Sequence, residues 1–127
     1  MLNTLLVFLG CGIGGVLRYW MTTFTYMIFD RNLPHGTIIV NVSGSLLMGL
    51  LTVLLETKFS AFDTHLRALL LVGVLGGYTT FSTFSMDTLI LFETGRFVSA
   101  ITYIFGSVLL CLVSVWGGAL LAKHILA

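Results

Sequence analysis

The chain has 127 residues, of which 57% are hydrophobic and only 9% are charged, and its formal net charge is +1. Soluble domains carry about 25% charged residues, so this composition, with a mean hydropathy of +1.08, indicates an all-α integral membrane protein. The sequence has no basic patch, phosphate-binding glycine loop or nucleophile with an adjacent base, which argues against nucleic-acid binding and against an enzyme.

Four apolar segments are each near or above the roughly 20 residues that a membrane-spanning helix needs. They cover residues 2–29, 37–55, 66–92 and 97–122. The connections over 30–36, 56–65 and 93–96 are short, so we expect a single four-helix membrane domain over residues 1–127. The first segment is too long for the core of a signal peptide, and we therefore keep it as a mature helix.

The first segment combines small residues with one buried charge. Gly10 and Gly14 are four residues apart, a spacing that lets two membrane helices approach closely. Arg18 lies well inside the same segment, where a guanidinium exposed to lipid is costly. It either snorkels toward the interface or faces a watery vestibule in which its charge attracts anions, and we favour the vestibule.

The second segment places Asn41 and Ser45 four residues apart, so that they share one helix face. An amide at this depth needs a hydrogen-bond partner. That partner is either a neighbouring helix or a permeating species.

The third segment is interrupted at its centre by the sequence GGYTTFSTFS, residues 76–85. Two glycines followed by hydroxyls are poor material for a lipid-facing helix. Backbone groups freed by a break inside a membrane must be satisfied by protein, water or an ion. We therefore predict a mid-membrane break here and regard it as the working site.

Three further side chains of this segment have more than one interpretation. Aromatic rings have a positive edge, so Phe81 and Phe84 either pack against neighbours or stabilise a small anion. Asp87 lies toward the end of the segment. We interpret it as an end-of-helix or ion-paired residue rather than a transport residue.

The fourth segment carries a stripe of polar side chains, Tyr103, Ser107 and Ser114, with Cys111 between them. A row of hydroxyl donors without a carboxylate suits an anion that is losing water better than it suits a cation or a proton relay.

The basic residues are almost evenly divided between the two ends of the predicted bundle. Lys58, Arg67 and Lys123 fall on the side of the termini, whereas Arg31 and Arg96 fall on the opposite side, toward which Arg18 leans. An excess of Lys and Arg normally fixes orientation. A near tie predicts insertion in both orientations, and an antiparallel homodimer follows as a hypothesis.

The whole chain resembles the small bacterial fluoride channels of the Fluc or CrcB family. Residues 76–85 look like the family signature G-G-x-T-T-F-S-T-F-S without a mismatch. Residues 41–44 are similar to its N-x-x-G motif, and residues 14–18 resemble its G-x-x-x-R pattern. Cys111 departs from the hydroxyl residue expected in the fourth helix, where Ser114 is a candidate substitute.

The resemblance implies an antiparallel, dual-topology homodimer that is multi-pass in the bacterial inner membrane and exports fluoride passively through two pores. It also implies a structural Na⁺ at the centre, held by the backbone carbonyls of Gly76 and Thr79. The implied fluoride pore comprises Asn41, Phe81, Ser82, Thr83, Phe84, Tyr103 and Ser107.

Two rival classes remain open. A small dual-topology multidrug or cation transporter needs a membrane-central carboxylate, which the first segment lacks. A non-transporting membrane subunit would use the same small-residue packing, but it would not need Phe81, Asn41 and the broken third helix to converge.

Overall fold

The computed structural model describes residues 1–58 and 63–127, and every regular element within these ranges is helical. The elements are α1 (Leu2–Ile28), α2 (His35–Lys58), α3 (Asp63–Leu66), η1 (Arg67–Leu75), α4 (Gly76–Tyr78), α5 (Phe81–Glu93) and α6 (Phe97–Leu126). Four stretches, 2–28, 35–58, 64–93 and 97–126, are long and apolar enough to cross a membrane. The prediction of four spans is confirmed.

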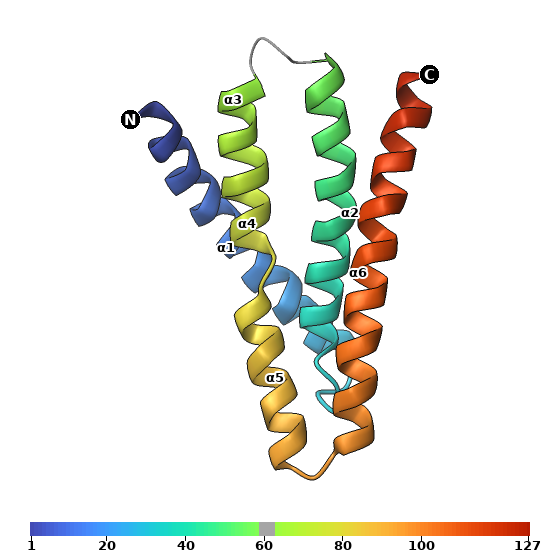
Figure 1. The fold of residues 1–127 in the computed structure, drawn as a ribbon. Helices are drawn as coiled ribbons and strands as arrows, with labels where there is room; N and C mark the ends of the chain where they lie inside the picture. The colour runs from blue at the N-terminus through green and yellow to red at the C-terminus, as the bar shows by residue number, and fades with distance from the viewer. Residues whose placement is uncertain (59–62) are drawn as a thin grey trace.

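The connection predicted over residues 56–65 is shorter than expected. Helix α2 continues to Lys58 and helix α3 begins at Asp63, while residues 59–62 lie outside the described part of the chain. Both termini lie at the end of the bundle where α2 ends and α3 begins, and the turn between α5 and α6 lies at the opposite end (Figure 1). This arrangement places the basic residues on the two sides assumed in the sequence argument.

Helix α1 crosses the bundle diagonally (Figure 1) and packs against the third span through glycines on both partners. A Cβ at Gly10 would lie 2.8 Å from the Cα of Gly73, and a Cβ at Gly77 would lie 2.6 Å from the carbonyl oxygen of Cys11. Real side chains do not tolerate such distances from backbone. The predicted close packing at Gly10 and Gly14 is confirmed, and its partner is a second small-residue pair, Gly73 and Gly77.

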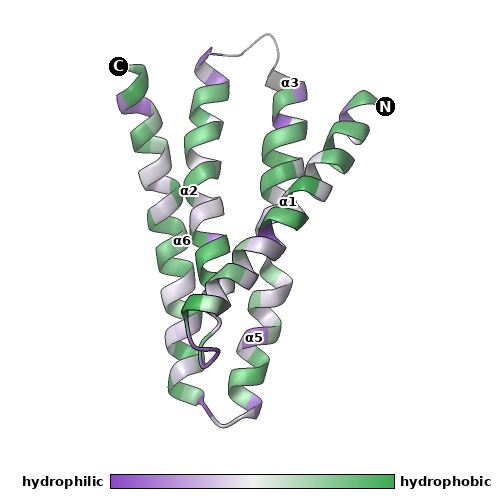
Figure 2. Cartoon of the chain, turned by 180° about the vertical axis from the view of Figure 1, so that it is seen from behind, coloured by the Kyte–Doolittle hydropathy of each residue, from purple (hydrophilic) through white to green (hydrophobic). Residues whose placement is uncertain are grey.

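Helices α2 and α6 lie side by side (Figures 1 and 2) and also approach through glycine. A Cβ at Gly49 would overlap the Val115 carbonyl oxygen, and one at Gly118 would overlap the Leu46 carbonyl oxygen. Close approach of this kind lets two membrane helices associate by packing, because lipid provides no hydrophobic drive between them.

The third span is not one helix. Residues Arg67–Leu75 form a π-helix and Gly76–Tyr78 continue it as a short α-helix. Thr79 and Thr80 are then extended, with φ/ψ of −76°/158° and −151°/117°, before α5 begins. The mid-membrane break is present, but it lies at the two threonines, because both glycines of the motif remain helical.

The turn between α5 and α6 is as tight as the sequence predicts. Gly95 has φ of +74°, which a residue without Cβ adopts freely. The Arg96 amide donates to the Leu91 carbonyl at 2.9 Å, a closure typical of a helix that ends in a glycine. The Arg96 guanidinium donates to the Asn32 carbonyl, and so ties this turn to the connection between α1 and α2.

Two apolar clusters lie on either side of the break. Leu55, Leu71 and Leu75 form one, and Leu91, Ala100 and Tyr103 form the other. Hydrophobic residues make up most of every long helix, whereas most hydrophilic residues lie near helix ends and in the connections (Figure 2). The polar groups near the break therefore lie between apolar layers.

Candidate functional site

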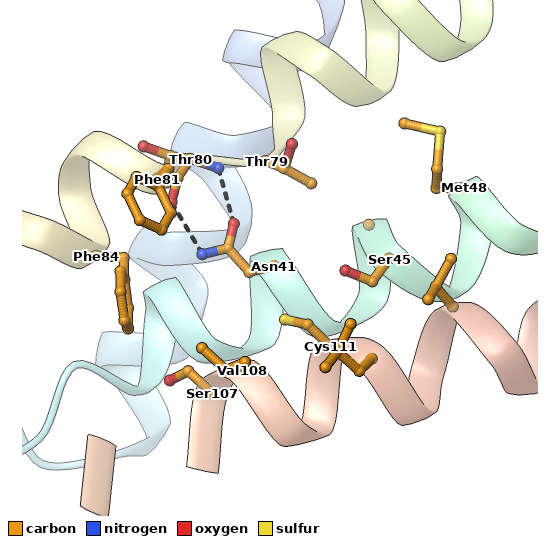
Figure 3. Close-up of a pocket in the computed structure, with 13 residues that line it drawn as sticks. Asn41, Ser45, Met48, Thr79, Thr80, Phe81, Phe84, Ser107, Val108 and Cys111 are labelled. Carbon is orange, nitrogen blue, oxygen red and sulfur yellow. Dashed lines mark hydrogen bonds between the residues drawn. The ribbon is translucent and has the colours of Figure 1, made fainter. Parts of the chain in front are cut away.

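The broken third span is closed by one side chain of α2. Asn41 accepts a hydrogen bond from the Thr80 amide through Oδ1 at 2.8 Å, and its Nδ2 donates to the Thr80 carbonyl at 2.9 Å (Figure 3). The side-chain amide of Asn41 thereby pairs both backbone polar groups of Thr80, which is in an extended conformation. Asn41 joins the two helices, and because its NH₂ group has two donors, one N–H remains after the bond to Thr80.

Thr80 also starts the helix that follows the break. Its Oγ1 accepts from the Thr83 amide at 3.2 Å and donates to Thr83 Oγ1 at 2.9 Å. A threonine in extended conformation that accepts from the third helical residue is an N-cap. The hydroxyls of the motif therefore start α5, and Thr83 is engaged in that cap.

Two carbonyls at the break lose their usual helical partners. The Gly76 carbonyl would accept from the Thr80 amide in a continuous α-helix, but that amide donates to Asn41 instead. The Thr79 carbonyl receives only a long bond, 3.4 Å, from Nη1 of Arg18. Arg18 is thus placed against the break, where its charge faces a carbonyl dipole.

A cavity of about 370 Å³ lies beside the break, between α2, α5 and α6 (Figure 3). Its wall combines neutral polar groups with apolar ones, and no described residue that lines it carries a formal charge. The lining residues are Asn41, Gly44, Ser45, Met48, Thr79, Thr80, Phe81, Phe84, Ser107, Val108, Cys111, Leu112 and Val115.

Ser107 is the most unusual residue of this wall. It is only 6% exposed, and among the described residues its Oγ has no hydrogen-bond partner. A buried hydroxyl without a partner costs about 1–3 kcal/mol, so such a group calls for an explanation. An explanation that fits the position of Ser107 is that its hydroxyl binds a small solute that enters the cavity.

Aromatic rings form a row from the cavity into the bundle. The ring centroids of Phe81 and Phe84 are 5.3 Å apart, and those of Phe84 and Tyr103 are 5.1 Å apart, each pair tilted by about 40°. Phe84 is therefore held on both sides. Phe81 has one ring neighbour and is 76% exposed in the single chain.

Asp87 ends this row. Its Oδ2 accepts from Thr37 Oγ1 at 2.7 Å and from the Tyr103 hydroxyl at 3.2 Å. Asp87 lies within α5, and in the described residues it has hydroxyl partners and no ion-pair partner, so the carboxylate is stabilised by hydroxyls within the bundle.

Of the seven predicted pore residues, the structure brings four into the cavity wall: Asn41, Phe81, Phe84 and Ser107. Ser82, Thr83 and Tyr103 do not line it. The Tyr103 hydroxyl bonds Asp87, and the Ser82 hydroxyl lies 3.3 Å from that of Thr80. Their predicted contacts with a permeating ion stay predictions.

Ser45 was missed as a site residue. It lines the cavity and makes no hydrogen bond with any described residue, and its spacing from Asn41 was the signal that could have identified it.

Cys111 faces the cavity, whereas Ser114 does not. The thiol therefore takes the expected hydroxyl position, and Ser114 does not replace it at this cavity.

Comparison with known proteins agrees with the fold and motifs. A family model described as CrcB-like protein, Camphor Resistance (CrcB), matches residues 5–119. A protein of Coxiella burnetii named fluoride-specific ion channel FluC is 44% identical over 98% of this chain and 100% of its own length. Proteins of the same name from Methylococcus capsulatus and a Caulobacter species are 46% and 42% identical over 98% of this chain, covering 54% and 98% of their own lengths.

Proposed function

The chain belongs to the CrcB-like family, since the family model spans most of its length, and on this premise we propose that it is a passive fluoride channel. Curated relatives that carry the name fluoride-specific ion channel FluC match nearly the whole chain. The cavity beside the helix break is the proposed path, and the chemistry of its wall suits a small anion.

The unpaired Ser107 hydroxyl is the observation that carries this proposal. It is buried against the same cavity as Asn41, which keeps one N–H after bonding Thr80. Hydrogen-bond donors of this kind replace part of the water that fluoride loses. Because the described lining holds no carboxylate and no fixed cation, an anion is neither repelled nor bound too tightly to leave, which conduction requires.

The rings of Phe81 and Phe84 supply the second part of the mechanism. Their edges carry partial positive charge, and both residues line the cavity at its junction with the break. Edges turned toward the path stabilise an anion without a proton donor. The contact of Phe84 with Tyr103 holds that ring in place, so its orientation is fixed before the ion arrives.

A second copy of the chain is needed to complete the path. Phe81 lines the cavity yet remains 76% exposed in one chain, and a ring that faces lipid cannot serve an ion. We place an antiparallel copy over this face, as the near tie of basic residues suggests. Two-fold symmetry then gives two equivalent pores.

The carbonyls of Gly76 and Thr79 fit a structural Na⁺. The break removes the usual hydrogen-bond donor of the Gly76 carbonyl and leaves the Thr79 carbonyl with only a long bond. Hard cations prefer oxygen ligands of this kind. Together with the same two carbonyls of a second copy, these groups would hold the ion, which would neutralise the unpaired carbonyl dipoles at the break. Arg18, whose Nη1 lies 3.4 Å from the Thr79 carbonyl oxygen, would supply positive charge at the proposed vestibule.

Passive export follows from physical chemistry. Hydrogen fluoride crosses lipid as a neutral acid and ionises in the more alkaline cytoplasm, where the anion is trapped. A negative interior drives an anion outward with about 2.3 kcal/mol per charge per 100 mV. A channel in the bacterial plasma membrane therefore needs no coupling to another energy source.

Purified protein in liposomes tests the function. A fluoride electrode should record rapid fluoride efflux once a potassium ionophore collapses the opposing potential, and chloride-loaded liposomes should show none above protein-free controls. A proton-coupled cation transporter or a scaffold subunit would give no fluoride efflux, which would refute the proposal.

A further inference from the structure

A second cavity, of about 280 Å³, lies at the far end of α1, away from the proposed fluoride path. Its lining residues are Tyr19, Thr22, Thr23, Tyr26, Met27 and Arg31. The proposed channel mechanism does not use these side chains. We propose that this cavity binds the phosphate group of a membrane phospholipid.

The position of the cavity is the first argument. Helix α1 has 27 residues and is therefore about 40 Å long at 1.5 Å per residue, which exceeds a hydrocarbon core of about 30 Å. Because α1 is inclined to the bundle (Figure 1), tilt takes up part of this excess length. The last turns of α1 supply five of the six lining residues and lead directly into the polar connection that holds Arg31, so we expect them near headgroup depth. Tyr19 and Trp20 are 68% and 62% exposed there, as is typical of the aromatic belt at a membrane interface.

The polar groups of the cavity match a phosphodiester. The guanidinium of Arg31 lies over the ring of Tyr26, 5.6 Å from its centroid, a contact that leaves the N–H groups in its plane able to bind an oxyanion. The hydroxyls of Thr22 and Thr23 make no hydrogen bond with any described residue. One cation and two free donors therefore face the same space.

No described carboxylate lines the cavity beside Arg31. Asp30 is exposed and does not line the cavity, and the described residues contain no ion pair between it and Arg31. The other basic residue at this end, Arg96, donates to the Asn32 carbonyl. Arg31 is accordingly the cation that remains for an anionic ligand.

The apolar part of the wall favours a lipid over a free anion. Met27 is 76% exposed at the edge of the cavity, where it can cover the first carbons below a glycerol phosphate. The floor is fixed, because a Cβ at Gly36 would lie 2.8 Å from Cγ2 of Thr22. The beginning of α2 thus packs closely against Thr22.

Native mass spectrometry of the delipidated protein titrated with phosphatidylglycerol tests this proposal, and it does not depend on channel activity. Wild type should bind one lipid per chain with measurable affinity. Arg31→Gln should weaken that affinity by at least roughly tenfold, because a hydrogen bond to a charged group contributes about 1.5 kcal/mol or more. The double variant Thr22→Val, Thr23→Val should weaken it as well, while Lys123→Gln, which removes an interfacial cation outside any described cavity, should not.

Equal affinity in wild type and Arg31→Gln would overturn the proposal. Glycerol phosphate and inorganic phosphate provide the second arm, since they offer the same headgroup chemistry without acyl chains. Neither should displace the lipid at the concentration that saturates it with phosphatidylglycerol. Displacement by either would show that the cavity binds a soluble phosphate, and would refute the lipid assignment.

Discussion

Replacing the aromatic rings of the path with isoleucine separates packing from permeation. Phe81 has one ring contact and Phe84 has two, and each such contact contributes about 0.5–1.5 kcal/mol beyond area burial. Phe81→Ile should therefore cost about 1 kcal/mol of stability and Phe84→Ile about 2 kcal/mol, both small enough to leave a folded protein. Fluoride efflux should fall by more than about tenfold in each, corresponding to at least about 1.4 kcal/mol, because the positive ring edges are lost.

Phe92→Ile is the matched control. Phe92 lies on the same helix and has one ring contact, 6.0 Å to Phe97, but it does not line the cavity. Size-exclusion profiles and electrode-measured efflux from liposomes should be compared for all three variants. Normal elution with near-normal efflux in both Phe81→Ile and Phe84→Ile would show that the rings only pack, and the proposed mechanism would be wrong.

Three other predictions address assembly. Reporter tags at the C-terminus should be accessible from both sides of the membrane in similar amounts, and two lysines added to the loop over 56–65 should bias insertion and lower activity; one dominant orientation would contradict the antiparallel dimer. Complete removal of Na⁺ during purification should lower the dimer's melting temperature or its fluoride flux, and indifference of both would exclude the cation. Gly14→Ala, whose Cβ would overlap the Val74 carbonyl oxygen, should cost about 1–3 kcal/mol, whereas Gly12→Ala meets nothing within 4 Å and should be tolerated; equal melting temperatures would refute the packing argument.

The sequence predicts the fold at the level of spans and turns. Apolar length identifies the four membrane segments and the short connection over 93–96, where the structure shows a turn with Gly95 at a φ of +74°. The break was located only approximately, because a glycine pair signals both helix interruption and close packing. Only the tertiary contact of Gly77 with the Cys11 backbone shows that packing is its role, leaving the interruption to Thr79 and Thr80.

The candidate site was predicted in its residue types more than in its geometry. Asn41 was expected either to join helices or to face an ion, and the structure shows the first role directly through both bonds to Thr80. Helical spacing could not determine which face of α6 borders the cavity, so Cys111 and Ser114 could not be distinguished. Nor could it show that Tyr103 bonds Asp87, because that contact joins residues 16 apart across two helices.

The passage of fluoride through the cavity is tested most directly by fluoride efflux from liposomes that contain Ser107→Ala. Removing a buried hydroxyl that lacks a partner should leave the free energy of unfolding unchanged or raise it by about 1–3 kcal/mol. Fluoride efflux should fall by roughly tenfold or more, because the ion loses one hydrogen-bond donor. Ser114→Ala, on the same helix but outside the cavity wall, should conduct like wild type. Normal efflux in Ser107→Ala would contradict the account.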